Sequence, residues 1–144
     1  MNYIERIEIN KPIEEVITLF NNPKYYTKWM PGVSTHEIIK GKNKEAGSVS
    51  MYQIMLNGKD NEMNESIIKN NGPEILAEYT INGIVNTQKT TFIALDNETT
   101  LYQIDENFDL KGFLKIIGFF LPGMFKKQTK KFALAFKNFA ENKK

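Results

Sequence analysis

Four acidic side chains on or near expected strands are the residues whose type could do acid–base chemistry. They are Glu65, Asp105, Glu106 and Asp109. Two carboxyl groups that face an apolar cavity can hold a raised pKa and move a proton to or from a bound substrate. The plainer interpretation places these charges at strand edges or at a rim. We therefore assign no catalytic residue from the sequence.

Metal and nucleophile chemistry have few candidates. His36 is the only histidine and cysteine is absent, which removes disulfides, thiolate catalysis and cysteine-ligated metal. One histidine also argues against a His-cluster metal site or a Ser-His-Asp triad, and we interpret His36 as an ordinary strand residue. The sequence contains no phosphate-binding loop and no dinucleotide fingerprint. We expect no metal and no cofactor.

The chain after Pro122-Gly123 predicts one long amphipathic helix. At helical spacing an apolar stripe with one threonine falls within about 80° of arc, and lysines occupy the far side. The stripe consists of Phe125, Thr129, Phe132, Phe136 and Phe139. A helix with this stripe needs a broad apolar surface to lie on.

Strand signals fill most of the remaining chain. Alternation and turn residues predict strands over 3–9, 33–40, 48–56, 63–69, 75–81, 84–95 and 99–108. Two short helices are expected after the first strand, over 12–20 and 23–29. The fold class is therefore α+β, a strongly curved antiparallel sheet of about seven strands wrapped on the long C-terminal helix. At 144 residues, we expect a single domain over 1–144.

Several short motifs support this arrangement. They are Asn10-Lys11-Pro12-Ile13-Glu14-Glu15-Val16, Phe20, Asn22-Pro23, Lys28-Trp29-Met30-Pro31-Gly32-Val33 and the ending Phe136-Lys137-Asn138-Phe139-Ala140-Glu141. With this order of elements, essentially the whole chain resembles the SRPBCC or START-like superfamily of helix-grip proteins, which includes polyketide cyclase/dehydrase-like and lipid-transfer-like members. The ending resembles the family's closing "LKxxxE" pattern, with Phe136 where Leu is commoner. These motifs are structural, so no activity transfers residue by residue.

The resemblance implies a hydrophobic ligand between the sheet and the long helix. We predict binding of a hydrophobic small molecule or lipid in a cavity with aromatic walls and a few phenolic hydroxyls. The candidate lining residues are Trp29, Tyr52, Tyr79, Phe92, Tyr102, Phe113, Phe125, Phe132 and Phe136. The alternative is that these side chains pack on one another and leave no space.

The segment 113–121 is apolar nearly all round, but it is about half the roughly 20 residues that a membrane-spanning helix needs. We therefore expect no integral membrane segment. One interpretation is a mobile gate with Gly118, Pro122 and Gly123 as its weak points, and the other is a buried helix start bent by Pro122. As an exposed patch, the segment could also touch a membrane or a partner.

Two other functions stay open beside ligand binding. In a cyclase/hydratase-like enzyme, a cavity carboxylate or tyrosine would move a proton; we lean against an enzyme. In a protein-partner module, similar to chaperone- or ribosome-associated members of the superfamily, Tyr25, Tyr26 and Trp29 would lie at the surface.

Charge and the N-terminal sequence give weaker expectations. The net charge of +2 provides no strong field for nucleic acid or an anionic membrane, and we interpret the lysine-rich helix face as solvated. Because the first residues lack the apolar region of a secretory signal, we expect a cytoplasmic location. We also expect a monomer or a weak homodimer.

Overall fold

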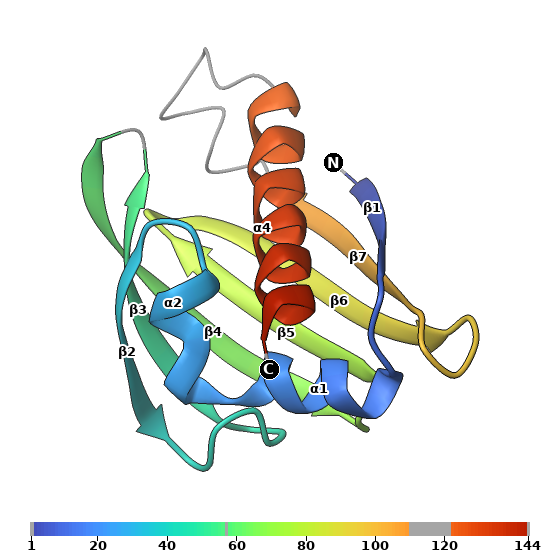
Figure 1. Ribbon diagram of the computed structural model, residues 1–144. Helices are drawn as coiled ribbons and strands as arrows, with labels where there is room; N and C mark the ends of the chain where they lie inside the picture. Colours follow the sequence, from blue (N-terminus) through green and yellow to red (C-terminus); the bar gives the residue numbers. More distant parts are fainter. Residues whose placement is uncertain (1, 57, 110–121, 144) are drawn as a thin grey trace.

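Seven strands form one antiparallel sheet in the order β1-β7-β6-β5-β4-β3-β2. The computed structural model describes residues 2–56, 58–109 and 122–143. Its elements in chain order are β1 (Asn2–Ile9), α1 (Ile13–Asn21), the 3₁₀ turn η1 (Pro23–Tyr25), α2 (Tyr26–Trp29), β2 (Val33–Lys40), β3 (Val49–Leu56), β4 (Lys59–Asn70), β5 (Glu74–Ile81), β6 (Ile84–Ala94), β7 (Thr100–Asp109) and α4 (Pro122–Asn142). The sheet curves around α4, with α1 and α2 at one end (Figure 1).

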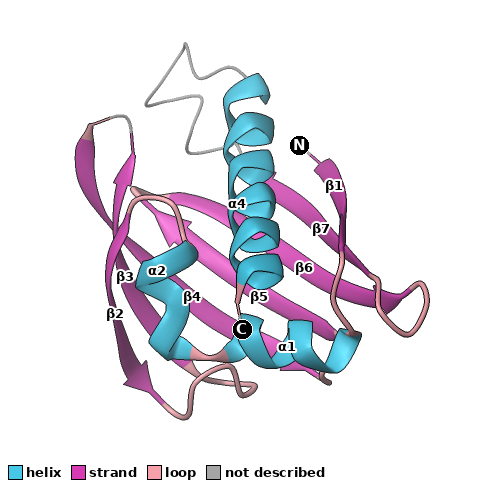
Figure 2. Ribbon diagram, in the orientation of Figure 1, coloured by secondary structure: helices cyan, strands magenta, loops and turns pink. Residues whose placement is uncertain are grey.

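The local sequence explains how the short helices begin and end. Pro12 precedes α1 in an extended conformation, and Glu14 and Glu15 lie in the first turn, where they favour the positive end of the helix dipole. The side chain of Asn22 accepts a hydrogen bond from the Lys24 amide at 3.0 Å, which caps η1. Figure 2 shows these helices crossing the end of the sheet, where the side chain of Phe20 is buried in the core.

Turn chemistry sets the hairpin between β5 and β6. Asn82 and Gly83 both have positive φ, 49° and 79°, which is the conformation required by a tight two-residue hairpin turn. The resulting register places Tyr79 opposite Asn86 and Ala77 opposite Gln88. The side chains that alternate inward on the sheet therefore form continuous rows across it.

Helix α4 packs through its aromatic stripe. Phe136 is fully buried, and its ring centroid lies 5.1 Å from that of Phe20 and 4.9 Å from that of Trp29. In the last turn of the same helix, the Glu141 carboxylate accepts a hydrogen bond from the backbone amide of Asn10, just after β1, at 2.8 Å. The helix is thus fixed to α1, α2 and the end of β1.

The predicted fold class is confirmed: an antiparallel curved sheet, short helices after the first strand and a long C-terminal helix. Strand β4 begins at Lys59, four residues before the predicted start, because the hairpin with β3 continues to the pair Leu56 and Lys59. Phe113 and Gly118 lie outside the described residues. Pro122 and Gly123 open α4, and their role in a gate stays a prediction. Within the described residues, no helix has the length and apolar character needed to cross a membrane.

Candidate functional site

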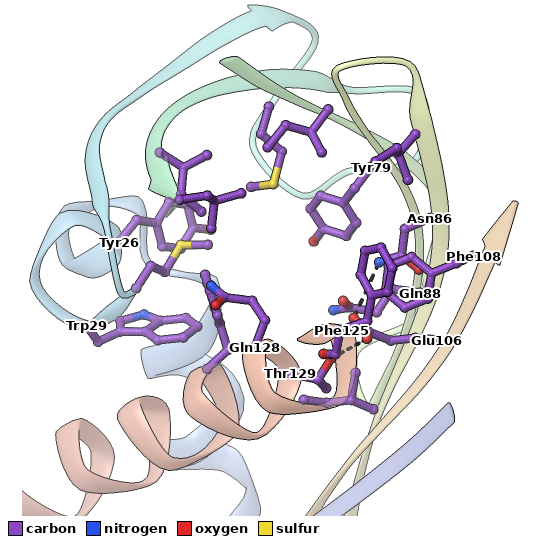
Figure 3. Close-up of a pocket in the computed structure, with 18 of the residues that line it drawn as sticks. Tyr26, Trp29, Tyr79, Asn86, Gln88, Glu106, Phe108, Phe125, Gln128 and Thr129 are labelled. Carbon is purple, nitrogen blue, oxygen red and sulfur yellow. Dashed lines mark hydrogen bonds between the residues drawn. The ribbon is translucent and has the colours of Figure 1, made fainter. Parts of the chain in front are cut away.

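A cavity of about 180 Å³ lies between the concave face of the sheet and α4. Its sheet wall includes Ile54, Met63, Ile81 and Ile104, and α4 contributes Phe125, Gln128, Thr129 and Phe132. Tyr26 and Trp29 of α2 close one side (Figure 3). The interior is therefore mostly apolar, with a small number of polar groups in the walls.

The aromatic residues selected from the sequence separate into two groups. Trp29, Tyr79, Tyr102, Phe125 and Phe132 line the cavity. Tyr52, Phe92 and Phe136 are buried in the core beside it instead of forming its wall. Phe113 is outside the described residues.

Phe20 explains why Phe92 and Phe136 lie in the core. Its ring lies 5.2 Å from Phe92 and 5.1 Å from Phe136, and Phe92 stacks on Tyr102 at 5.3 Å. Aromatic rings therefore fill the space next to α1. The cavity occupies the remaining space, toward the N-terminal part of α4.

One polar cluster centres on Glu65 of β4, which is only 1% exposed. Lys44 Nζ lies 2.7 Å from Glu65 Oε2 and donates to it. The hydroxyl of Tyr79 donates to the same oxygen at 2.6 Å, and that of Tyr52 donates to Oε1 at 3.2 Å. Lys44 and Tyr79 also line the cavity, so this cluster forms part of its wall.

Both members of this ion pair stay charged. Burial alone would raise the pKa of Glu65, but the Lys44 ammonium and the hydrogen bonds hold it below its usual range. Burial alone would lower the pKa of Lys44, but the Glu65 carboxylate holds it well above its usual range. Burial and the same carboxylate raise the pKa of Tyr79, so its hydroxyl stays a neutral donor.

A second carboxyl group, Glu106 of β7, lies farther across the sheet wall of the cavity, beyond Asn86 of β6. It shares a hydrogen bond with Thr129 of α4 and accepts another from Asn86 Nδ2 at 3.3 Å, as Figure 3 shows. Burial raises the pKa of Glu106, although both hydrogen bonds oppose this shift. One cavity therefore has a carboxylate held charged near one part of its wall and a carboxyl group biased toward its neutral form at another.

The interpretation of all four acidic residues as rim charges was wrong for Glu65 and Glu106. Glu106 shares the inward face of β7 with Ile104 and Phe108 because side chains alternate along a strand. That alternation was a signal available in the sequence. Asp109 is exposed and Asp105 is half-buried.

Other polar lining residues were missed at the sequence level. Asn86 and Gln88 lie on the inward face of β6, in the same every-second-residue row as the buried Thr90 and Phe92. The period of two could therefore have identified them. Lys44 is in the loop between β2 and β3, where every neighbour is polar or small. No local pattern distinguishes it from the exposed Lys42.

His36 lies on β2, where its ring packs 4.9 Å from Tyr26 and 4.8 Å from Tyr52, and burial lowers its pKa. The described residues contain no group of three or more side chains suited to holding a metal ion. Tyr26 and Trp29 are buried, which contradicts the exposed aromatic surface that the protein-partner alternative required.

Comparison with known proteins relates this geometry to a family. Residues 4–141 match the profile of the family described as polyketide cyclase/dehydrase and lipid transport. No curated protein matches the sequence.

Several solved structures have the same fold. A START superfamily protein from Mycobacterium smegmatis is 16% identical, with 97% of each chain covered and a TM-score of 0.77. The Zhui aromatase/cyclase from Streptomyces sp. R1128 is 14% identical, with 98% of this chain and 93% of that chain covered and a TM-score of 0.76. Norcoclaurine synthase from Thalictrum flavum, in complex with dopamine and hydroxybenzaldehyde, is 15% identical, with 100% and 88% covered and a TM-score of 0.72. At these identities the likeness concerns the fold.

Proposed function

Because this chain belongs to the polyketide cyclase/dehydrase and lipid transport family, we propose that it binds a small hydrophobic molecule in the cavity between its sheet and α4. The observation that carries the proposal is the cavity itself, about 180 Å³ with largely apolar walls and a few inward polar groups. Ligand sites in proteins have this composition. Removal of apolar ligand surface from water would drive binding, at about 25 cal/mol per Å².

The cavity volume favours a compound with a single ring. An apolar protein cavity of about 150 Å³ is enough to hold benzene, whereas drug-sized ligands occupy roughly 300–1,000 Å³. The norcoclaurine synthase structure contains dopamine and hydroxybenzaldehyde, which are both single-ring compounds. We therefore favour a small ring compound over a long acyl chain.

Titration calorimetry with cumene, a small apolar ring compound, tests this function. Ile81 lines the cavity, so Ile81→Trp should fill the space and abolish binding. Ile93 is exposed, and Ile93→Trp is the matched control that should bind as the wild type does. No saturable binding to the wild type, or equal binding to both variants, would overturn the proposal.

A second candidate function is proton transfer on a bound ketone, as in a cyclase-like enzyme, and Glu106 is the observation that favours it. Its carboxyl group lines the cavity, and burial raises its pKa, which brings a carboxylate closer to the range of a useful general base. Such a base would remove a proton from the carbon beside the carbonyl and return one from solvent. In D₂O, the wild type should exchange the methyl protons of acetophenone faster than Glu106→Gln does. Equal exchange rates would reject this candidate.

A further inference from the structure

Lys44 is a buried cation in the cavity wall whose hydrogen-bonding capacity is only partly used. We propose that Lys44 donates a hydrogen bond to a carbonyl or hydroxyl oxygen of an uncharged ring compound bound in the cavity. This inference rests on the proposed function, because it identifies the chemical class of the ligand for the same cavity.

The lysine ammonium has three N–H donors. Glu65 Oε2, at 2.7 Å, is the only hydrogen-bond acceptor for Lys44 among the described residues. On other sides the ammonium lies 5.2 Å from the ring centroid of Tyr26 and 5.9 Å from that of Phe20. Aromatic faces attract a cation but do not satisfy its N–H groups as an oxygen would. A ligand oxygen can therefore take a donor that the protein leaves open.

Stability does not account for the position of Lys44. Apolar side chains of similar volume often stabilise a fold at least as well as a buried ion pair does. Lys44 also adopts a φ of 64°, in the left-handed region that residues with a side chain seldom occupy. Its carbonyl accepts a hydrogen bond from Asn70 Nδ2 at 2.8 Å, which fixes the loop in this strained position. Backbone strain of this kind is concentrated at functional sites.

The charges around Lys44 favour an uncharged ligand. The Glu65 carboxylate already balances the ammonium at 2.7 Å. A ligand carboxylate would bring an additional negative charge into a buried site, at a large desolvation cost, whereas a carbonyl or hydroxyl oxygen would not.

The ion pair also makes Lys44 a hydrogen-bond donor and not a nucleophile. Burial opposes its charge, but Glu65 holds the pKa of Lys44 well above its usual range. An ammonium has no lone pair with which to attack a carbonyl carbon. Recognition through Lys44 therefore requires no covalent bond to the ligand.

Three probes of nearly the same shape separate these possibilities by calorimetry: acetophenone has a carbonyl, cumene has no oxygen and benzoate has a carboxylate. The double variant Lys44→Met/Glu65→Gln removes both charges together. The glutamine amide at position 65 keeps one acceptor oxygen for one of the two tyrosine hydroxyls, and its NH₂ group can donate to the other. Because Lys44 lines the cavity, affinity for both probes can change, and the ratio of the affinities for acetophenone and cumene is the readout. We expect the affinity for acetophenone to fall at least about tenfold relative to that for cumene, the low end of the value of a hydrogen bond to a charged group. Lys42→Met, at an exposed position of the same loop, should bind all three probes as the wild type does.

A measurement on the wild type alone avoids dependence on the folding of the variant. In ¹H–¹⁵N spectra of the lysine ammonium groups, acetophenone should shift the Lys44 signal clearly more than cumene does, because the two rings are alike and only the ketone can accept a hydrogen bond. The inference is overturned if the ratio of acetophenone to cumene affinity is unchanged in the double variant, if acetophenone shifts the Lys44 signal no more than cumene does, or if benzoate binds the wild type most tightly. If cumene still binds the wild type when one of these results is found, this inference fails and the proposed function is supported. If neither acetophenone nor cumene binds the wild type, the proposed function and this inference both fail.

Discussion

Glu65 on β4 and Tyr79 on β5 are directly opposite each other in the sheet, and the Tyr79 hydroxyl donates to the Glu65 carboxylate at 2.6 Å. The Lys44 ammonium, in the loop between β2 and β3, donates to the same carboxylate. The concave face thus contains a buried ion pair beside an apolar cavity, and this pair connects the loop between β2 and β3 to the sheet.

The ion pair should respond very differently to single and double substitution. Lys44→Met leaves the Glu65 carboxylate buried without its cation, and we expect a loss of about 3–5 kcal/mol in the free energy of unfolding. Lys44→Met/Glu65→Gln should recover most of that loss, because no unpaired charge remains. Urea denaturation measures both values, and Lys42→Met should stay within about 0.5 kcal/mol of the wild type. Equal losses in the single and double variants would contradict the ion-pair account.

Glu106 should make stability depend on pH in a known direction. Burial raises its pKa in the folded state above the value of about 4.3 expected in the unfolded chain. Below the unfolded-state value both states hold the proton and Glu106 causes no penalty. As pH rises toward the folded-state pKa, the unfolded chain releases its proton first and stability falls.

Glu106→Gln removes that titration and keeps a side chain of similar shape. Urea denaturation at a series of pH values should show the variant gaining stability relative to the wild type as pH rises from about 4, the region where an unperturbed glutamate titrates. A difference between the two proteins that does not change with pH would show that burial does not shift the Glu106 pKa.

Trp29 should report ligand binding by its fluorescence. It is the only tryptophan, it lines the cavity, and its ring centroid lies 6.5 Å from that of Phe132 on the facing helix. Acetophenone in the cavity would contact the indole, so we expect saturable quenching. Ile93→Trp/Trp29→Phe, with its indole on the exposed face of β6, should show no saturable quenching. Saturable quenching of both proteins would place the ketone outside the cavity.

The packing of α4 should depend on one face of the helix. Phe136 is 0% exposed and contacts the rings of Phe20 and Trp29, so Phe136→Ala should lower the free energy of unfolding by about 3–5 kcal/mol. Leu134 on the same helix is 42% exposed, and Leu134→Ala should change stability by about 0.5 kcal/mol or less. Similar losses in both variants would indicate that the stripe is not the packing face.

The fold was predictable because its signals are local and repeated. Alternation along β5 and β7 predicted these strands, and the Asn82-Gly83 turn between β5 and β6 has the positive φ values that a tight hairpin requires. The phenylalanine spacing in α4 gave the packing face of the helix, since a period near 3.6 has no other simple explanation.

The site was less predictable because it depends on contacts between distant segments. Glu65 shares the inward face of β4 with Met63 and Ile67, but the apolar Ile68 follows Ile67 on the other face. The pattern of β4 therefore did not single out one inward face. The burial of Lys44 follows from a loop that closes onto a carboxylate 21 positions later in the chain. The extent of the cavity depends on Phe20, whose ring packs on Phe92 and Phe136 at one end of the space. Its place on the apolar face of α1 indicates burial, but the sequence does not show which part of the space it occupies.

The most direct test of the account is the position of a bound probe in solution. Isotope-filtered NMR spectra of the protein saturated with cumene should show intermolecular nuclear Overhauser effects to the methyl groups of Ile54, Ile81 and Ile104, which line the cavity. Effects confined to exposed methyl groups such as Ile39 or Ile68, with none to the cavity residues, would contradict the claim that the space between the sheet and α4 is the binding site.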